Sequence, residues 1–455
     1  MSQRARVAVV GGGVAGLAAA HRLVERGVRE VVLLEAGDRL GGSIATERRD
    51  GFTIEAGADS FLTEKPWAVD LCERLGVPLV GTREGERRTY VVHDGRIEPL
   101  PDGFLLLAPT DLRALVASLL FSWRGKLRMA LDLVLPRSTA ADESLAHFVR
   151  RRLGREALER VAEPLAGGIY TADAERLSLA ATMPRFRELE RKYRSIIRGL
   201  HASAGASRAA GARYSLFAAP ADGMGALVEA LARCLPEGVV RLRAPAGALA
   251  HDGATWGLRA SGEALIADAL VLAAPAHAVA SLLAPLDAAL GRLLGEIEYA
   301  SSATVTLAYR RADVPGARGF GFVVPAVEHR ALIACTYASR KFPGRAPEGH
   351  ELVRAFVGGA LRPDLLARDD AALVEVVRGE LRALAGVTAA PELVRVHRHR
   401  LAMPQYVVGH LERVAAIEAR AAALPALSLA GAAYRGVGVP DCVRSGAAAA
   451  DQVLD

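Results

Sequence analysis

This 455-residue chain contains few cysteines, and no two of them are close together in the sequence. Because no C-x-x-C pair is present, the sequence has neither the pattern of a disulfide-rich secreted protein nor the usual spacing of a zinc site. We therefore expect no metal site and a reducing compartment, the cytoplasm. The four cysteines are Cys72, Cys234, Cys335 and Cys442.

Lysine is also scarce, because only four of the 57 basic residues are lysines. The net charge is +6, but the arginines are scattered along the chain and aromatic residues make up only 5% of it. A nucleic-acid-binding surface typically gathers its basic residues on one face. The basic balance therefore reflects a bias in composition, and we expect no nucleic-acid partner.

Long apolar runs are absent as well. No stretch reaches the ~18 apolar residues that a transmembrane helix needs. A strand-like segment begins at Arg6, which leaves no room for a signal peptide. We expect a protein that is free in the cytoplasm or attached peripherally to the inner face of the cell membrane.

What the chain does contain is a dinucleotide-binding fingerprint over residues 6–42. A short β-branched strand leads into Gly11, Gly13 and Gly16, which form the pattern G-x-G-x-x-G at the start of an alanine-rich helix. The first glycine permits a tight turn, the second lets backbone N–H groups approach a pyrophosphate, and the third lets the helix lie close to the strand. The phosphate charge then meets the helix N-terminus.

An acid and two more glycines extend this fingerprint. Glu35 follows the second strand, where its carboxylate would accept hydrogen bonds from ribose hydroxyls and repel a 2′-phosphate. This favours FAD or NAD over NADP. Gly41 and Gly42 then let the chain pass close to a second part of a long cofactor, which an NAD site does not need, so we predict FAD.

A second glycine-rich turn from strand to helix lies at the other end of the chain. There, a strand at 427–431 runs into Gly436-Val-Gly-Val-Pro-Asp-Cys442. The N–H groups of a helix that starts here would face the electron-rich edge of a flavin ring. The alternative is a turn that only closes the domain.

Strand and helix patterns recur in three separated segments, which predict one discontinuous FAD-binding domain. These segments are 1–85, 220–290 and 403–455.

Segments of different character lie between them. Residues 299–360 alternate polar and apolar side chains, which predicts strands of an antiparallel sheet. The substrate domain built on this sheet is predicted to comprise residues 86–101 and 291–402. Apolar residues recur every three or four positions over 102–198, which predicts a helical insert, and 199–219 are expected to be a loop. The predicted fold class is α/β (α+β), with a Rossmann-type FAD domain, an antiparallel-sheet substrate domain and a helical insert.

Five further motifs are spread over the whole chain. They are Glu55-Ala-Gly-Ala-Asp-Ser-Phe61, Pro164-Leu-Ala-Gly-Gly-Ile-Tyr170, Gly319-Phe-Gly-Phe322, Met403-Pro-Gln-Tyr-Val-Val-Gly-His410 and Gly436-Val-Gly-Val-Pro-Asp-Cys442. Together they resemble the protoporphyrinogen and coproporphyrinogen III oxidase family, within the FAD-dependent amine-oxidase-like superfamily. The resemblance implies an FAD domain, a substrate domain on an antiparallel sheet, and a helical domain that can dock on a membrane.

The resemblance also implies a set of contacts to non-covalently bound FAD. Ser43 stands where relatives often have a longer polar side chain, and His399 stands where an aromatic residue is expected beside the flavin. The implied contacts are Gly11, Gly12, Gly13, Val14, Ala15, Gly16, Glu35, Ala36, Ser43, Gly57, Ala58, Asp59, Ser60, Ala246, His399, Val437, Gly438 and Val439.

For the substrate, the resemblance implies an apolar, aromatic-walled slot that suits a flat tetrapyrrole. Ordinary core packing is the alternative interpretation of Phe320. The implied pocket residues are Lys65, Arg88, Thr89, Gly168, Phe320, Val323, Leu332 and Ile333.

Two of these positions bear on which porphyrinogen is oxidised. Relatives that act on protoporphyrinogen IX commonly place an arginine where this chain has Thr89, next to Arg88. Lys65 instead matches a pocket lysine of coproporphyrinogen-oxidising relatives from Gram-positive bacteria. Coproporphyrinogen III carries four propionates and protoporphyrinogen IX two, so a more positive pocket favours the former. Coproporphyrinogen III is therefore predicted, with protoporphyrinogen IX as the alternative.

The implied reaction needs little from side chains. A hydrogen leaves a meso carbon as hydride to the flavin while the pyrrole nitrogens lose protons. O₂ then reoxidises the flavin and becomes H₂O₂, and three such rounds remove six hydrogens. We therefore predict no general acid or base. Lys65 is a candidate charge for the substrate or for a water molecule at the flavin.

Other classes share parts of this pattern. A flavin amine oxidase or a carotenoid desaturase would carry the same N-terminal unit, although amine oxidases often have Gly-Gly-Arg where this chain has Gly41-Gly42-Ser43. A flavoprotein regulator without enzymatic activity is a further alternative, but it would not need the Gly-Phe-Gly-Phe wall.

The helical insert contains apolar residues at 104–109 and 112–123, followed by Arg124, Lys126 and Arg128. Such a segment would rest on an anionic membrane or receive a partner such as ferrochelatase. The alternative is a helix packed within its own domain.

Overall fold

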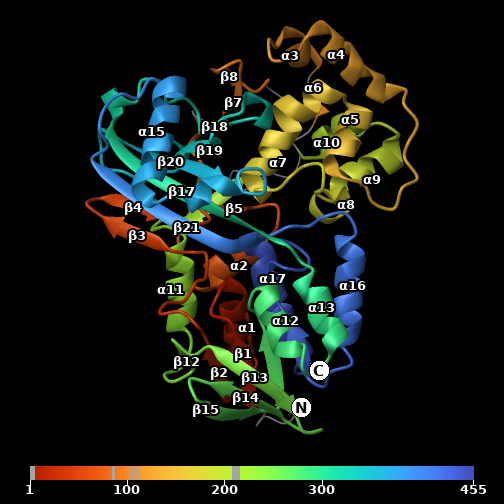
Figure 1. The fold of residues 1–455 in the computed structure, drawn as a ribbon, viewed down its shortest axis with the longest axis vertical. Helices are drawn as coiled ribbons and strands as arrows, with labels where there is room; N and C mark the ends of the chain where they lie inside the picture. Colours follow the sequence, from red (N-terminus) through yellow and green to blue (C-terminus); the bar gives the residue numbers. More distant parts are fainter. Residues whose placement is uncertain (1–5, 85–87, 102–103, 106–107, 110–111, 208–215) are drawn as a thin grey trace.

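A computed structural model describes residues 6–84, 88–101, 104–105, 108–109, 112–207 and 216–455 of the chain. It has three parts, with a parallel sheet and its helices in the lower half of Figure 1 and a larger sheet and a group of helices side by side in the upper half. The predicted combination of α/β and antiparallel architecture is confirmed.

The lower part is built on a five-stranded parallel sheet with the strand order β12-β2-β1-β16-β22. Strands from three distant segments of the chain therefore pair in one sheet. Their bounds are β1 Arg6–Val10, β2 Glu30–Leu34, β12 Val240–Arg241, β16 Ala269–Leu272 and β22 Leu427–Leu429.

Both faces of this sheet are covered, which explains why β1 is apolar at almost every position. Val7 and Val9 pack against helices on one face, and Ala8 and Val10 face the opposite layer. The first layer contains α1 Val14–Glu25, α2 Trp67–Arg74, α11 Gly225–Arg233 and α17 Val439–Gln452. The second contains a small antiparallel sheet of β13 Ala246–His251, β14 Trp256–Ala260 and β15 Glu263–Ala267, with α12 Ala276–Leu283, α13 Ala288–Gly295 and α16 His410–Ala421.

The upper sheet has seven strands in the order β21-β17-β20-β19-β18-β7-β8. It is antiparallel as predicted, except that β18 and β7 run parallel. The strands are β7 Thr89–His93, β8 Arg96–Pro99, β17 Tyr299–Arg310, β18 Gly321–Val323, β19 Leu332–Tyr337, β20 His350–Gly358 and β21 Leu393–Pro404.

The two faces of this sheet differ in chemistry. On β17, Ala303, Val305 and Leu307 are buried in the hydrophobic core that includes α15 Asp370–Ala385. Thr304 and Thr306 alternate with them and face the other way, where the Thr304 hydroxyl donates to the carbonyl of Ala56 at 2.9 Å. This polar face therefore meets the FAD-domain side of the molecule.

Short strands connect the two sheets. The hairpin of β3 Thr46–Arg49 and β4 Phe52–Glu55 lies beside β21, and β5 Phe61–Leu62, β11 Phe217–Pro220 and β6 Leu79–Gly81 form a three-stranded sheet. Glu55 is buried and accepts hydrogen bonds from the Thr46 hydroxyl at 2.7 Å and the Met224 N–H at 2.8 Å. It therefore fixes the start of α11, and burial raises its pKa.

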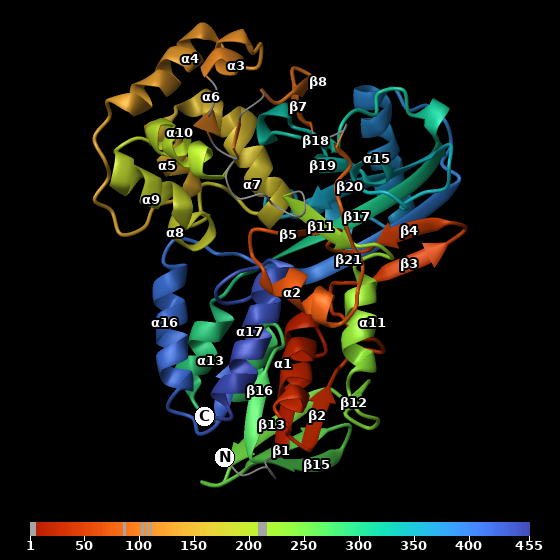
Figure 2. The same cartoon turned by 180° about the vertical axis from the view of Figure 1, so that it is seen from behind.

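The helical part has its own apolar core, and Figure 2 shows it from behind. A buried ion pair between Asp132 and Arg152 organises it, because Asp132 also accepts from the Ser195 hydroxyl and the Ile197 N–H. Its helices are α3 Leu112–Ala117, α4 Trp123–Ala130, α5 Leu145–Arg152, α6 Arg155–Ala157, α7 Glu163–Tyr170, α8 Leu179–Thr182, α9 Pro184–Tyr193 and α10 Ile196–Ser207. A two-stranded ribbon of β9 Phe104–Leu105 and β10 Ala108–Pro109 belongs to the same segment. Across the described residues, no helix combines the length and the apolar character that crossing a bilayer requires.

The expectation of a loop over 199–219 is wrong over much of its length. Helix α10 continues to Ser207, and β11 begins at Phe217. The helix continues because Ile196, Ile197 and Leu200 anchor it in the core of the helical part, which outweighs the weak helix preference of the small residues that follow. Residues 208–215 lie outside the described part of the chain.

Candidate active site

The N-terminal glycine turn joins β1 to α1 as the fingerprint predicts. A Cβ on Gly16 would lie 1.8 Å from the carbonyl oxygen of Gly11, so only glycine allows this close approach of helix and strand. Gly13 is the N-cap of α1, and no side chain caps the helix there. Among the described residues, no heavy atom lies within 4 Å of the position that a Cβ on Gly13 would take. The N-terminal N–H groups of α1 therefore face open space that an anionic group can fill.

Glu35 lies beside this turn, held in place by backbone donors. Its two carboxylate oxygens accept from the N–H of Gly12 at 2.6 Å and from the N–H of Gly37 at 2.7 Å. The Ala244 N–H donates to the Glu35 carbonyl at 2.8 Å, which brings the start of β13 and Ala246 to the same end of the sheet. Ala36 is exposed next to Glu35.

The segment after Glu35 returns to the glycine turn. The Gly41 N–H donates to the Gly12 carbonyl at 2.8 Å, and a Cβ on Gly42 would lie 3.4 Å from the Cα of Gly13. Arg39 fixes this return by donating to the carbonyls of residues 40, 42 and 44. The sequence analysis did not single out Arg39, because its partners are backbone atoms, which leave no mark in a side-chain pattern.

The C-terminal glycine turn is supported by Tyr406. The Tyr406 hydroxyl donates to the Ala432 carbonyl at 2.6 Å and accepts from the Gly436 N–H at 2.8 Å. Helix α17 begins with Gly438 as its N-cap, again without a side-chain cap. Val437 is half-buried, and Val439 is buried in the core like Val14 and Ala15 near the first turn, so these three offer only backbone atoms to a cofactor.

Lys65 lies at this C-terminal turn. Its ammonium group is 2.6 Å from a carboxylate oxygen of Asp441, which is buried in the first turn of α17. The Lys65 side chain remains 43% exposed, so it can face a bound molecule while it is paired. The pairing favours the second of its two predicted roles, because the charge sits at the turn assigned to the flavin and Asp441 neutralises much of it.

A third turn, residues 57–60, lies between these two. Gly57 packs on Ser43, whose carbonyl oxygen would be 2.1 Å from a Cβ on Gly57. Ala58 and Ser60 are half-buried, and Asp59 binds Lys341 at 2.9 Å. His399 shares an Nε2 hydrogen bond of 2.9 Å with the carbonyl of Ala56, and burial lowers the pKa of its imidazole. A contact chain thus joins the N-terminal turn, Ser43 and the 57–60 turn.

The predicted substrate residues lie largely where α7 meets β18 and β19. Gly168 is exposed, and a Cβ there would lie 3.7 Å from Val323. A Cβ on Gly167 would lie 3.8 Å from the side chain of Ile333. We call Gly167, Gly168, Val323 and Ile333 the wall. Gly167 is buried, so of the two glycines it is Gly168 that leaves the backbone of α7 accessible.

Leu332 does not belong to this wall, so its prediction as a pocket residue is wrong. It is 3% exposed and packs in the core beneath the seven-stranded sheet, on the face opposite Ile333. Neighbouring residues of a strand point to opposite faces, so only one of the two could line a pocket.

Phe320 and the residues near Thr89 lie at the edge of the same region. Phe320 is half-buried, and its N–H donates to the Arg88 carbonyl at 3.0 Å. Thr89 pairs with Gly321 across the parallel β7–β18 contact, and Arg88 is exposed. The structure thus brings Arg88, Thr89 and Phe320 together beside β18, where they adjoin Val323.

Two polar residues near this wall escaped the sequence analysis. Glu163 accepts from the Ala326 N–H at 3.1 Å, and burial raises its pKa to about 7. Burial likewise raises the pKa of Tyr170 to about 12, with Asp441 as a further cause. Both residues lie within motif-bearing α7, but only the packing of that helix on the sheet shows that they are enclosed.

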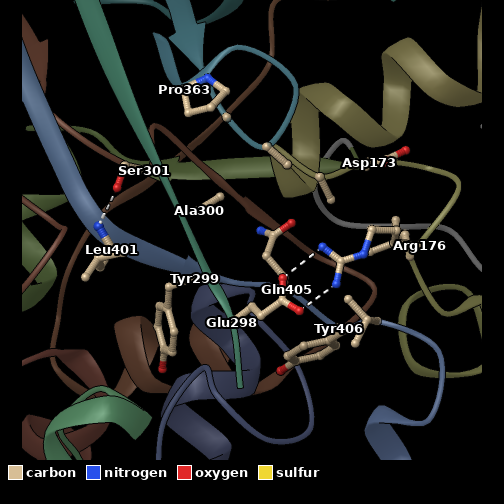
Figure 3. A pocket seen from close by; sticks show the side chains of 15 residues that line it. Asp173, Arg176, Glu298, Tyr299, Ala300, Ser301, Pro363, Leu401, Gln405 and Tyr406 are labelled. Carbon is tan, nitrogen blue, oxygen red and sulfur yellow. Dashed lines mark hydrogen bonds and ion pairs between the residues drawn. The ribbon is translucent and has the colours of Figure 1, made fainter. Parts of the chain in front are cut away.

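A cavity of about 360 Å³ lies between the helical part and the ends of strands β17 and β21 of the seven-stranded sheet (Figure 3). Arg176 forms a two-pronged ion pair with Glu298 at its side, and Gln405 and Tyr406 lie next to that pair. Gln405 donates to the Tyr170 carbonyl at 3.2 Å. None of the predicted substrate residues lines this cavity.

One cluster of potential metal ligands occurs among the described residues, His93, Asp94 and Glu328. The two oxygens of Glu328 accept from the N–H groups of Asp94 and Gly95, at 2.8 and 3.0 Å. Glu328 therefore holds the turn between β7 and β8, which accounts for the cluster without a metal.

The observed groups fit FAD. Two uncapped helix N-termini, at Gly13 and Gly438, can each receive electron-rich groups, and the fixed carboxylate of Glu35 is placed for ribose hydroxyls. The wall on α7 and the seven-stranded sheet lies in a separate part of the molecule from these cofactor-turn residues. Fold and site together define a flavin-dependent oxidoreductase with a Rossmann-type cofactor domain and a separate substrate sheet.

Comparison with known proteins gives the family. Residues 14–454 match the flavin containing amine oxidoreductases. The chain is 35% identical to coproporphyrinogen III oxidase of Bacillus subtilis (strain 168), over 98% of this chain and 97% of that protein. It is 36% identical to coproporphyrinogen III oxidase of Propionibacterium freudenreichii subsp. freudenreichii, over 98% and 90%, and 32% identical to protoporphyrinogen oxidase of Bos taurus, over 98% of both. The chain therefore belongs to the flavin-containing amine oxidoreductases and, within them, to the porphyrinogen oxidase family that its motifs resemble.

Solved structures agree with this assignment. A crystal structure from Exiguobacterium sp. 255-15 is 33% identical and superposes with a TM-score of 0.89, covering 100% of this chain and 99% of the other. Reduced UDP-galactopyranose mutase shares the fold at 17% identity, with a TM-score of 0.74 over 99% of this chain and 95% of the other. The protein is an FAD-dependent enzyme, as the two glycine turns predicted.

Proposed function

We propose that this protein oxidises coproporphyrinogen III to coproporphyrin III, with O₂ as electron acceptor and H₂O₂ as by-product. The observation that carries the proposal is the near full-length similarity to two proteins named coproporphyrinogen III oxidase, at higher identity than to the bovine protoporphyrinogen oxidase. Oxidation of protoporphyrinogen IX is the second candidate.

When bound, FAD supplies the redox chemistry, accepting electrons from the substrate and passing them to O₂. The protein's own residues bind and orient the two partners. The uncapped starts of α1 and α17 would hold the cofactor, and Tyr406 fixes the second turn through Gly436. Gly168, Val323 and Ile333 form the wall against which the macrocycle lies. Positioning of this kind is the main contribution that a hydride transfer requires from a protein.

The charges near the wall bear on substrate choice. Thr89 offers no charge to a propionate, whereas Arg88 next to it is exposed at the edge of the sheet. Lys65 is paired with Asp441, so the cofactor turn is a better assignment for it than a propionate. The choice between coproporphyrinogen III, with four propionates, and protoporphyrinogen IX, with two, then depends on exposed cations such as Arg88 at the edge of the sheet. A propionate can reach these cations from solvent.

The proposal is tested by supplying the purified protein with each porphyrinogen in air. We expect porphyrin fluorescence to appear, with a higher kcat/KM for coproporphyrinogen III and three molecules of H₂O₂ for each porphyrin formed. A higher kcat/KM for protoporphyrinogen IX would favour the second candidate. Oxidation of neither porphyrinogen, with turnover of an amine instead, would replace the proposal with an amine oxidase.

We further propose that the helical part rests on an anionic membrane surface. A row of exposed apolar side chains at three- and four-residue spacing runs along α3, α4 and the following turn, which is unusual for a surface that faces water. We call these six residues the apolar row: Val116, Leu119, Trp123, Leu127, Leu131 and Val134.

The basic residues predicted to accompany this surface are only partly available to it. Arg124 is exposed. Arg128 donates to the carbonyls of Arg150, Arg151 and Arg152, and Lys126 donates to the Val116 carbonyl at 2.7 Å and lies over the Trp123 ring. Apolar insertion therefore contributes more to membrane attachment than charge does. A protein partner such as ferrochelatase is the alternative occupant.

A further inference from the structure

A buried ionic cluster lies directly under the turn at residues 57–60. Lys341, at the end of α14 (Ala338–Lys341), is 2.9 and 3.1 Å from the two carboxylate oxygens of Asp59 and 3.1 Å from the Ser60 hydroxyl. Arg354 on β20 is 3.4 Å from Asp59 and donates to the Gly57 carbonyl at 2.7 Å. The Lys341 and Arg354 side chains are 14% and 1% exposed. One strand and one helix of the substrate domain thus reach the 57–60 turn through charged groups.

This cluster carries more positive than negative charge. Asp59 is one anion between two cations, and the cations outweigh burial to hold the pKa of its carboxyl well below the usual range. The neighbouring imidazoles of His397 and His399 do not offset this positive charge, because burial lowers their pKa and so favours the neutral form. Burial raises the pKa of Glu55, which limits its help as a second anion. Arg345 contributes another buried cation, and its guanidinium donates to the carbonyls of Pro220 and Ala221.

Several buried polar atoms beside this cluster, within the described part of the chain, also have no hydrogen-bond partner. Among the described residues, the Arg354 Nε, the Thr306 Oγ1 and the His397 Nδ1 are buried without a hydrogen-bond partner. Thr306 and Arg354 pair across β17 and β20, and His397 lies on the adjacent strand β21. A buried cation without a matching anion is costly, so folded proteins normally place an opposite charge near it.

FAD at the 57–60 turn explains the imbalance. Two-electron reduction of a flavin near neutral pH adds two electrons and one proton, so the ring system gains one negative charge. Excess positive charge nearby favours the reduced form because it stabilises that added charge. Lysine is used at this position in a chain with only four lysines, and a second one, Lys65, binds the acid at the other flavin turn.

We propose that Lys341 and Arg354 are positioning residues that hold the 57–60 turn on the substrate sheet and raise the reduction potential of the bound flavin. The inference rests on FAD at this turn, and it holds whichever porphyrinogen is the substrate. Asp59 has the opposite effect on the potential, because its carboxylate offsets part of the positive charge. A purely structural cluster would not distinguish the signs of these charges.

Lys341 and Asp59 carry opposite charges, so their removal should shift the reduction potential of the flavin in opposite directions. The FAD-loaded Lys341→Met, Asp59→Asn and Lys341→Arg variants are reduced anaerobically against a reference dye, and the flavin absorbance gives the midpoint potential. We expect Lys341→Met to lower the ratio of reduced to oxidised flavin at least tenfold at a fixed potential, equivalent to about 30 mV for a two-electron couple. Asp59→Asn should raise the ratio, and Lys341→Arg, which keeps the charge, should leave it near wild type.

Matched controls make the result decisive. Lys192→Met removes a lysine from α9, far from the turn in the sequence and outside the cluster, and should leave the potential unchanged. Shifts of the same sign for Lys341→Met and Asp59→Asn, or no shift in either, would overturn the inference. If Lys341→Met does not retain FAD, the upward shift of Asp59→Asn and the unchanged Lys341→Arg still decide. The titration needs no porphyrinogen, so failure of the proposed function would be seen separately as absence of turnover.

Discussion

Lys65 and Asp441 are 376 positions apart in the sequence, yet their charged groups meet at 2.6 Å in the first turn of α17. This contact joins the segment after β5 to the C-terminal glycine turn, so two segments far apart in the chain are tied together. The ammonium group is partly exposed and paired at the same time. The charge of Lys65 therefore acts electrostatically on any group that is bound at the N-terminus of α17.

We therefore expect Lys65→Ala to reduce kcat/KM for coproporphyrinogen III and protoporphyrinogen IX by similar factors. Loss of a charge-assisted hydrogen bond corresponds to about 1.5 to 3 kcal/mol, or roughly tenfold to 150-fold. Steady-state kinetics with both substrates measures this. A selective loss for coproporphyrinogen III would instead place Lys65 at a propionate. Thr89→Arg is the companion variant. It restores the arginine that the resemblance gives to relatives acting on protoporphyrinogen IX, so it should shift the ratio toward that substrate, whereas a shift toward coproporphyrinogen III would show that the added charge alone decides.

Replacement of Glu35 should weaken FAD retention. Glu35→Ala removes the carboxylate that the Gly12 and Gly37 N–H groups hold in place, and with it the acceptor for ribose hydroxyls. We expect roughly tenfold to 150-fold weaker binding, from a contact worth roughly 1.5 to 3 kcal/mol. Flavin fluorescence after dilution and filtration measures the loss. Glu30→Ala, which removes an exposed acid paired with Arg6, is the control and should retain FAD.

A larger side chain in the wall on α7 should weaken substrate binding without lowering the stability of the protein. Gly168 is exposed and has room for a Cβ, so Gly168→Leu should raise KM for the porphyrinogen while the melting temperature and the FAD content stay near wild type. Leu332→Ala should behave in the opposite way. It leaves a cavity in the core and should lower the free energy of unfolding by about 2 to 5 kcal/mol with little change in KM. If Gly168→Leu leaves KM unchanged, the wall is not the substrate site.

Glu163 should make stability depend on pH. Its folded-state pKa of about 7 lies above the value of about 4.3 for an unfolded chain, so its contribution is fully present at low pH and is lost as the pH rises through 7. Relative to Glu163→Gln, the wild type should therefore lose on the order of 2 kcal/mol between pH 5 and pH 8. Chemical denaturation of both proteins across this range measures the difference. Parallel pH profiles would show that Glu163 titrates normally.

The apolar row should control attachment to anionic vesicles. The double change Trp123→Ser and Leu127→Ser removes two side chains that are 66% and 69% exposed, and each full insertion is worth about 1.5 to 3 kcal/mol. We expect at least a tenfold loss in co-sedimentation with phosphatidylglycerol vesicles. Val327→Ser, an exposed apolar residue on another part of the surface, is the control. No binding of the wild type at low salt would contradict the membrane proposal and favour a protein partner.

The sequence was sufficient where structure depends on neighbours in the chain. Residues 6–42 place a strand, a glycine turn, a helix and an acid in order, and the close approach of Gly16 to Gly11 involves groups five positions apart. Side chains of a strand point alternately to its two faces, and the sequence of β17 alternates in the same way. The sequence alone therefore assigns its threonines and valines to different faces. Because these relationships are local, the FAD domain and the sheet could be predicted.

Only the tertiary structure decided the relationships that depend on distant packing. Leu332 and Ile333 are both apolar, so the sequence does not say which of them faces the core, and the packing of α15 on one face of the sheet settles it. Tyr406, Glu163 and Lys341 gain their surroundings from segments far along the chain, as when Lys341 meets Asp59 across 282 positions. The charge balance beneath the 57–60 turn is a property of these contacts, since the same residues kept apart in solvent would be screened and independent.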